Sequence, residues 1–279
     1  MDKKALSVDM DREYSPSSVA ANYQSVIDEY SASSERAMKR LTHSIIGYGT
    51  HEDEYIILFE PQARGSCSSL FVFFHGGYWQ ALSARDACFA APMLNERGVA
   101  YAAVNYSLAP NASIATIVAQ CIAAMKCLAA RMPDARIVIG GSSAGAHLAA
   151  MLTATDWTLA GMKKPPFSGA ILISGIYDLH PLVGTYINEP LGLDFESATH
   201  VSPMHQRLKS SVDTVVCWGE HETEAFKQQS LDYAGLLARA GVRTSMYEVK
   251  KKNHFDILFD LTDATNRLSV DTLLLLGEK

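Results

Sequence analysis

The stretch Gly140–Ala150, GGSSAGAHLAA, decides the fold because it sets two serines among small residues between a strand and a helix. The apolar run 135–141 predicts the strand, and residues 144–154 predict the helix. Residues 141–145 match G-x-S-x-G, a pattern that presents a serine on a strained strand-to-helix turn, where small neighbours let the backbone pass closely. The reactive serine is therefore predicted to be Ser143 and not Ser142.

Strands and helices alternate along most of the chain on either side of this turn. Apolar runs predict strands at 43–48, 54–60, 69–74, 99–106, 135–141, 169–175, 211–219 and 243–250. Helical patterns lie at 83–98, 113–128, 144–154 and 223–241, with a final helix from about residue 255. This alternation predicts an α/β fold with a mostly parallel central sheet and helices on both faces.

The length of 279 residues fits one large α/β domain. We expect a single domain over 1–279, with an N-terminal helical segment at about 15–40. The segment 178–204 breaks the alternation and is rich in proline, glycine and histidine. It is therefore predicted to form an irregular cover over the site.

A serine nucleophile needs a base, and the base needs an acid that orients it. In α/β-hydrolases these follow in the order serine, acid, histidine. His254 stands in the polar loop after the last predicted strand, where such a base would lie. Glu222 follows the preceding strand and is the acid that the spacing favours. Glu220 in the same loop and Asp178, one strand earlier, are the alternatives, although Asp178 also suits a turn or helix cap.

The sequence HGGYW at residues 75–79 follows an early strand and predicts an oxyanion hole. Adjacent glycines let backbone N–H groups point into a cavity with no Cβ in the way. We assign the donors to Gly76, Gly77 or Tyr78, together with the N–H of Ala144. Tyr78 and Trp79 are candidates for an aromatic substrate pocket, and core packing is an equal alternative for both.

The other histidines have no assigned chemistry. His75 is interpreted as a structural hydrogen-bonding residue, and His147, inside the helix after the nucleophile, as a packed core residue. The remaining histidines lack metal-ligand spacing, so neither a metal nor another cofactor is expected. These parts together predict a serine hydrolase of the α/β-hydrolase fold.

Composition restricts the partners and the compartment. The net charge of −6 argues against nucleic acid or an anionic membrane as a partner. The N-terminus shows no secretory pattern, and no apolar run is expected to span a bilayer. Five scattered cysteines indicate reduced thiols. We therefore expect a cytoplasmic enzyme for a small molecule, and a homodimer is left open.

The chain also resembles the kynurenine formamidases (arylformamidases), relatives of the hormone-sensitive-lipase group within the α/β-hydrolases. The resemblance lies in REYSPSS (12–18), HGGYWQ (75–80), GSSAGAHLAA (141–150), SGIYDLHPL (174–182), WGEHETEAFKQQS (218–230) and NHFDIL (253–258). It implies Ser143 as nucleophile and His254 as base. The acid of that family is usually aspartate, and here Glu222 stands at its position.

The resemblance implies hydrolysis of a small aryl formamide, N-formyl-L-kynurenine, to kynurenine and formate through an acyl-enzyme. The same residues would serve a carboxylesterase or an amidase for another small acyl or aryl substrate, since the fold does not fix the substrate. A binding protein on a hydrolase scaffold is a third alternative. The chain carries a serine, an acid and a histidine in the catalytic order, which argues against this third alternative.

Overall fold

The computed structural model describes residues 9–61 and 68–278. They form one eight-stranded sheet in the order β1-β2-β4-β3-β5-β6-β7-β8. Pairing is antiparallel between β1, β2 and β4 and parallel from β4 through β8. The strands are β1 His43–Gly47, β2 Tyr55–Phe59, β3 Ser69–Phe74, β4 Ala100–Val104, β5 Arg136–Ser142, β6 Gly169–Ile173, β7 Asp213–Gly219 and β8 Thr244–Val249.

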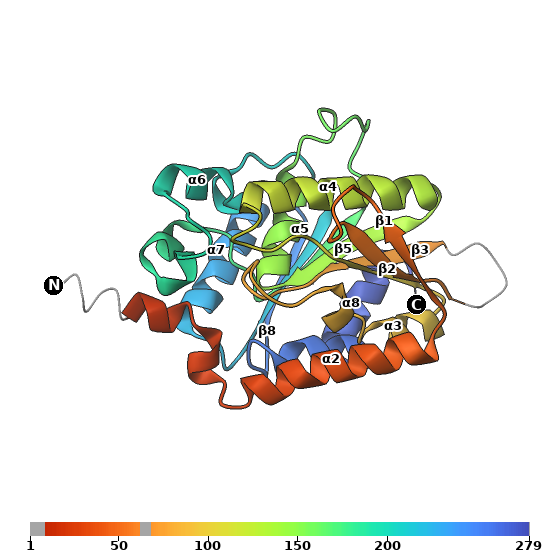
Figure 1. Ribbon diagram of the computed structural model, residues 1–279, viewed down its shortest axis with the longest axis horizontal. Helices are drawn as coiled ribbons and strands as arrows, with labels where there is room; N and C mark the ends of the chain where they lie inside the picture. Colours follow the sequence, from red (N-terminus) through yellow and green to blue (C-terminus); the bar gives the residue numbers. More distant parts are fainter. Residues whose placement is uncertain (1–8, 62–67, 279) are drawn as a thin grey trace.

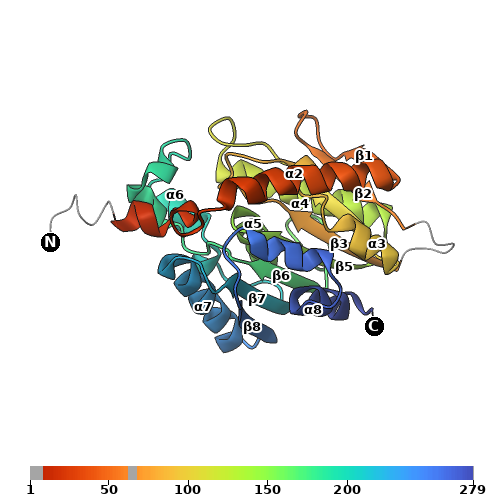
Figure 2. The ribbon, with the colours of Figure 1, turned by 90° about the horizontal axis from the view of Figure 1, so that it is seen from below.

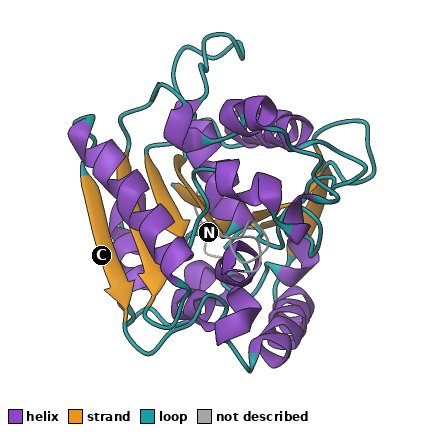
Figure 3. Cartoon of the chain, turned by 90° about the vertical axis from the view of Figure 1, so that its left-hand side faces the viewer, coloured by secondary structure: helices purple, strands orange, loops and turns teal. Residues whose placement is uncertain are grey.

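Helices cover both faces of the twisted sheet (Figures 1 and 3). One face packs against α4 (Ile114–Arg131), α5 (Ala144–Ala154) and α7 (Glu224–Arg239). The other packs against α2 (Tyr23–Arg40), α3 (Ala91–Glu96) and α8 (Arg267–Leu276). In Figure 2, α2 and α8 lie on the face turned toward the viewer. The predicted fold class is confirmed, because the sheet is mostly parallel and covered on both sides.

The central strands are apolar throughout because both of their faces are buried. All six residues of β3 are buried. Its side chains alternate between the two cores: Leu70, Val72 and Phe74 face one, and Phe71 and Phe73 face the other.

Two predicted helices are divided in the structure. The range 83–98 contains the short 3-10 helix η2 (Ala84–Asp86) and then α3, which has Pro92 in its first turn. A capping box between Ser83 and Asp86 closes η2 as a separate turn. The final helix is likewise divided into η6 (Asp256–Thr262) and α8. In the range 83–98, a cap and the placement of Pro92 therefore overrode a helical pattern in the sequence.

The segment 178–204 is more helical than the irregular cover expected from its composition. It contains η3 (His180–Gly184), η4 (Tyr186–Asn188) and α6 (Phe195–His200), and η5 (Pro203–His205) follows directly. Gln80 donates to the carbonyl oxygen of Ile187 at 2.9 Å, and the Tyr186 hydroxyl contacts that of Ser15 at 3.1 Å. These contacts hold the segment against the N-terminal residues and the loop after β3. Short 3-10 turns and α6 thus order it despite its prolines and glycines.

Helix α4 corrects one expectation from the sequence. Among the described residues, it is long and apolar enough, by length and composition alone, to cross a membrane. Its apolar stripe nevertheless packs into the core on the sheet, where Ile117, Cys121 and Leu128 are fully buried. Ser113 caps the helix by accepting a hydrogen bond from the backbone N–H of Thr116. In this structure α4 is a core helix of the α/β layer.

Candidate active site

Ser143 occupies the sharp turn between β5 and α5, with φ 55° and ψ −120°. This positive φ is strained for a residue with a side chain. The glycines of the motif make the turn possible. A Cβ on Gly145 would lie 1.9 Å from the carbonyl oxygen of Phe74, and one on Gly141 would lie 2.4 Å from the carbonyl of Gly145. The motif glycines are therefore required by close backbone contact, as the sequence indicated.

His254 and Glu222 form a buried pair beside this turn. His254 Nδ1 lies 2.9 Å from Glu222 Oε2, and the two side chains are 5% and 1% exposed. The other carboxylate oxygen, Oε1, accepts hydrogen bonds from Ser174 Oγ at 2.6 Å and from the Gly219 N–H at 2.5 Å. With its carboxylate held from both sides, Glu222 fixes the His254 ring with Nδ1 as the donor.

Glu222 is therefore the carboxylate that contacts the histidine, and the two alternative acids have other partners. Glu220 accepts from the Lys251 N–H at 2.8 Å and pairs with Lys250. Asp178 accepts from the backbone N–H of His180, as a turn residue does, and its carboxylate pairs with the side chains of His180 and His205.

Ser174 is a site residue that the sequence analysis missed. It directly follows β6, is fully buried and has a φ of 51°. Its N–H donates to the carbonyl oxygen of Cys217, which fixes the residue beside the end of β7. The only local signal is the small pair Ser174-Gly175 at the end of a predicted strand, a pattern shared by ordinary turns.

The loop after β3 lies against the nucleophile turn. A Cβ on Gly76 would come within 3.0 Å of the Ser142 carbonyl oxygen and 3.4 Å of Ser143 Cβ. Gly77, Tyr78 and Trp79 all have positive φ, at 98°, 53° and 58°. Within the described part of the chain, the N–H groups of Gly77 and Tyr78 have no hydrogen-bond acceptor. These unpaired donors directly follow Gly76, which contacts the serine turn, so they are available to an oxyanion at Ser143.

Ala144, the fourth predicted donor, is the first residue of α5. The N–H groups of the first helical turn have no partner within their own helix. The Ala144 N–H therefore has no partner within α5 and directly follows Ser143 in the chain, as the second donor of an oxyanion hole does.

Ser143 and His254 line a cavity of about 310 Å³. Its wall is strongly aromatic, with contributions from α2, β3 and the loop after it, the loop before α3, the cover segment and the loop before η6. These side chains are Tyr23, Tyr30, Phe73, Tyr78, Phe89, Tyr186 and Phe255. Tyr78 thus lies in the pocket as predicted from HGGYW, and its hydroxyl donates to the carbonyl oxygen of Tyr14 at 2.5 Å.

The assignment of Trp79 to the pocket is wrong. Trp79 is fully buried in the core and packs edge-to-face on His147, with ring centroids 4.9 Å apart. The turn at 77–79 sends neighbouring side chains in different directions, so only Tyr78 of the pair reaches the cavity.

His75 and His147 have the packing roles that the sequence indicated. His75 stacks on Tyr106 at 4.1 Å and its Nδ1 lies 2.8 Å from the Gly76 carbonyl oxygen. His147 Nε2 lies 2.6 Å from the Val201 carbonyl oxygen. Burial lowers the pKa of each ring to about 4, so both are neutral at neutral pH.

Comparison with known proteins defines the class first. Residues 71–257 match the family described as alpha/beta hydrolase fold. A solved structure of a candidate thioesterase from Silicibacter sp. TM1040 has a TM-score of 0.84 at 27% identity, covering 94% of this chain and 97% of that one. An esterase from Pyrobaculum calidifontis, at 20% identity, shares the fold with a TM-score of 0.72 over 92% of this chain and 95% of its own.

Two curated relatives then narrow the class. The chain is 33% identical to kynurenine formamidase of Danio rerio, with 99% of both proteins covered. It is 32% identical to kynurenine formamidase of Salmo salar, over 97% of this chain and 96% of the relative. The chain therefore belongs to the α/β-hydrolase family and, within it, to the group that contains these kynurenine formamidases.

Proposed function

We propose that this enzyme hydrolyses N-formyl-L-kynurenine to kynurenine and formate through a formyl-enzyme on Ser143. The observation that carries the proposal is the buried Glu222–His254 pair, whose histidine lines the same aromatic cavity as a strained serine. The relatives named kynurenine formamidase support the choice of an aryl formamide.

The proposed reaction begins with a proton transfer. Glu222 keeps the Nδ1 proton on His254, which leaves Nε2 to take the proton of the Ser143 hydroxyl. The serine oxygen attacks the formyl carbon, and the carbonyl oxygen becomes an oxyanion. N–H groups of Gly76, Gly77 or Tyr78 and of Ala144 stabilise that charge, at about 3 kcal/mol for each well-placed donor.

The tetrahedral intermediate then collapses as His254 gives its proton to the departing aryl nitrogen. Kynurenine leaves and the formyl group remains as an ester of Ser143. His254 next takes a proton from water, whose oxygen attacks the ester, and returns that proton to Ser143 Oγ as the ester bond breaks; the formic acid released ionises to formate. Glu222 stabilises the imidazolium that forms in both halves of the reaction.

The cavity supports an aromatic substrate. Tyr23 and Phe255 lie with ring centroids 5.8 Å apart, and Tyr30 packs on Phe89 at 5.5 Å. Aromatic rings attract one another in such tilted and offset arrangements, so an aryl amide gains contacts here that an alkyl amide lacks.

The test is steady-state turnover of N-formyl-L-kynurenine beside p-nitrophenyl acetate, with Ser143→Ala as the blank. The proposal expects Ser143-dependent cleavage of the formamide with kcat/KM above about 10⁴ M⁻¹s⁻¹, the low end for typical enzymes. Rapid ester cleavage with little formamide cleavage would show a carboxylesterase instead. Unchanged turnover by the alanine variant would reject the serine mechanism.

We also propose that the enzyme works in the cytoplasm on this small molecule, without nucleic acid or membrane as a partner. The four described cysteines are free, and Cys88, Cys121 and Cys217 are buried, which suits a reducing compartment. Cys67 lies outside the described residues. The net charge of −6 supports the exclusion of polyanionic partners.

A further inference from the structure

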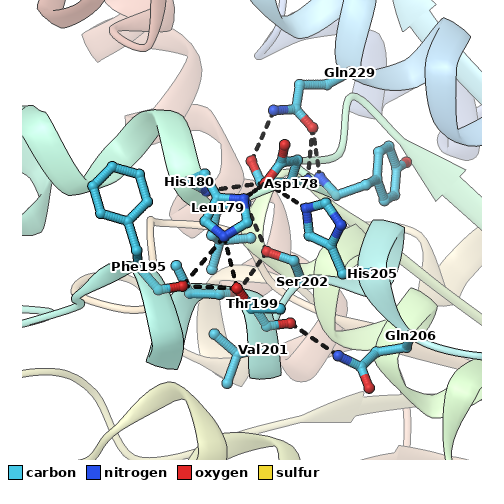
Figure 4. A network of polar contacts seen from close by, with 12 residues as sticks. Asp178, Leu179, His180, Phe195, Thr199, Val201, Ser202, His205, Gln206 and Gln229 are labelled. Carbon is cyan, nitrogen blue, oxygen red and sulfur yellow. Dashed lines mark hydrogen bonds and ion pairs between the residues drawn. The ribbon is translucent and has the colours of Figure 1, made fainter.

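Asp178, His180 and His205 come together at the base of the cover segment (Figure 4), and none of them lines the catalytic cavity. Asp178 follows β6, His180 begins η3 and His205 ends η5. One potential ligand atom from each side chain lies within 4.8 Å of the others. The sequence predicts no metal, because its histidines lack the spacing of known metal motifs. The fold nevertheless brings both ends of the segment to one point.

Two of the three donor separations are close to those in a metal's coordination shell, and the third is within 4.8 Å. Asp178 Oδ1 lies 3.0 Å from His180 Nδ1 and 3.1 Å from His205 Nε2. In a tetrahedral zinc site with ligand distances of about 2.0–2.1 Å, neighbouring ligand atoms lie about 3.3–3.4 Å apart. Small side-chain rotations would therefore place all three atoms on one ion.

The contacts of His180 define which ring nitrogen carries the proton. Its Nε2 lies 2.8 Å from Thr199 Oγ1 and 3.2 Å from the Phe195 carbonyl oxygen. The Thr199 hydroxyl already donates to the same carbonyl oxygen, so both atoms act as acceptors toward the ring. Nε2 must then be the protonated nitrogen, and Nδ1 directs its lone pair toward Asp178 unless the ring is doubly protonated.

This arrangement is typical of a metal-ligating histidine. Such a ring usually donates its second N–H to a carbonyl, carboxylate or hydroxyl group, which fixes its orientation and leaves the other nitrogen free for the ion. A cation between His180 Nδ1 and Asp178 Oδ1 would remove the repulsion between two facing lone pairs. Without it, the same contact requires an imidazolium ion paired with the carboxylate.

The backbone around the three donors is held in place. Gln229 on α7 accepts from the N–H of Asp178 at 2.9 Å and donates to its carbonyl oxygen at 2.8 Å. The Ser202 hydroxyl accepts from the Leu179 N–H at 2.8 Å. The Met204 N–H donates to the Tyr177 carbonyl oxygen at 2.9 Å, which joins the two ends of the cover. The ligand-bearing segments are therefore positioned before any ion binds.

We propose that Asp178, His180 and His205 form a binding site for Zn²⁺. A set of two imidazoles and one carboxylate binds zinc in preference to magnesium or calcium, which favour oxygen ligands. The side chains are 31%, 26% and 34% exposed, so water can complete the coordination. The ion joins the two ends of the segment that carries Tyr186 into the catalytic cavity. Its role is to fasten that segment, and Ser143 chemistry does not involve it.

The test is zinc binding to the full chain after chelator treatment, by equilibrium dialysis and by calorimetry. The variants are His205→Gln and His180→Gln, with His200→Gln as the matched control. His200 lies on α6 in the same segment, is exposed, and contacts its own helix backbone at the Glu196 carbonyl oxygen. Circular dichroism and esterase turnover verify that each variant folds.

The proposal expects one zinc ion per chain for the wild type and for His200→Gln. Loss of either ligand should weaken binding more than the roughly 10- to 100-fold that loss of an outer partner costs. Zinc should also raise the midpoint of thermal unfolding in the wild type but not in His205→Gln, because an ion that binds the folded state stabilises it. No zinc binding to the wild type, or equal binding by His205→Gln, would overturn the proposal and leave an imidazolium–carboxylate pair.

Discussion

Glu222→Gln is the substitution that most directly tests how the structure orients its base. Glu222 Oε1 accepts from the Gly219 N–H, which can only donate, and from the Ser174 hydroxyl. A glutamine must therefore keep its oxygen on this side and turn its NH₂ group toward His254. That NH₂ group cannot accept the Nδ1 proton, so His254 adopts the opposite tautomer, with its proton on Nε2.

The consequence for catalysis is large because the Nε2 lone pair is then lost. His254 can no longer take the Ser143 proton without first losing its own. The equivalent change in a serine–histidine–aspartate triad lowers kcat about 10⁴-fold, or about 5.5 kcal/mol of transition-state stabilisation. We expect a similar loss here, with KM nearly unchanged, because Glu222 is buried behind the histidine and does not line the cavity.

The assay is stopped-flow and steady-state turnover of N-formyl-L-kynurenine by the wild type, Glu222→Gln and Glu222→Asp. The aspartate variant keeps the charge but shortens the side chain by one carbon–carbon bond, about 1.5 Å. It should therefore lose less activity than the glutamine variant. If Glu222→Gln keeps more than a tenth of wild-type kcat, the tautomer argument is incorrect. A greater loss in Glu222→Asp would show that position matters more than charge.

Three further outcomes test the surrounding structure. Ser174→Ala removes one hydrogen bond to a buried carboxylate, so urea unfolding should show a loss of about 1.5–3 kcal/mol, and kcat should fall. Gly145→Ala forces a Cβ against the Phe74 carbonyl and should cost about 4 kcal/mol or more, whereas the exposed Gly184→Ala should change stability by less than about 0.5 kcal/mol. Finally, the depressed pKa of His147, about 4, means that unfolding takes up a proton below pH 6.5. Stability should fall by up to about 3 kcal/mol between pH 6.5 and 4, and urea titrations of His147→Gln should show a smaller fall.

The parts of the fold that were predictable from the sequence are those fixed by local sterics. Helix α5 begins and ends at the predicted residues, and β3 does likewise. The G-x-S-x-G motif could be interpreted because a Cβ on either glycine would collide with the backbone at Phe74, the last residue of β3. The serine, the acid and the histidine each follow a predicted strand, so their order along the chain could be predicted from the alternating pattern.

The wall of the cavity could not be predicted in the same way. Tyr23 and Tyr30 come from α2, more than a hundred residues before Ser143 in the chain. In the sequence they are two tyrosines at helical spacing, which a core-facing helix stripe explains equally well. Only the packing of α2 beside the carboxyl ends of the strands distinguishes a core-facing stripe from a cavity wall. Tyr30 belongs to both: it is buried, and it lines the cavity while its hydroxyl donates to the Phe255 carbonyl oxygen.

The choice of acid shows why spacing alone left three carboxylates open. Glu220 and Glu222 are two residues apart in the same loop, and both are charged side chains of the same length. They are distinguished by their surroundings, since Glu220 meets the exposed Lys250 while Glu222 meets a buried serine and a backbone N–H. That serine, Ser174, belongs to the neighbouring strand end. The acid is therefore selected by a contact between β6 and β7. A glutamate suits this site because one carboxylate oxygen, Oε1, reaches back to the end of its own strand while the other, Oε2, contacts the histidine.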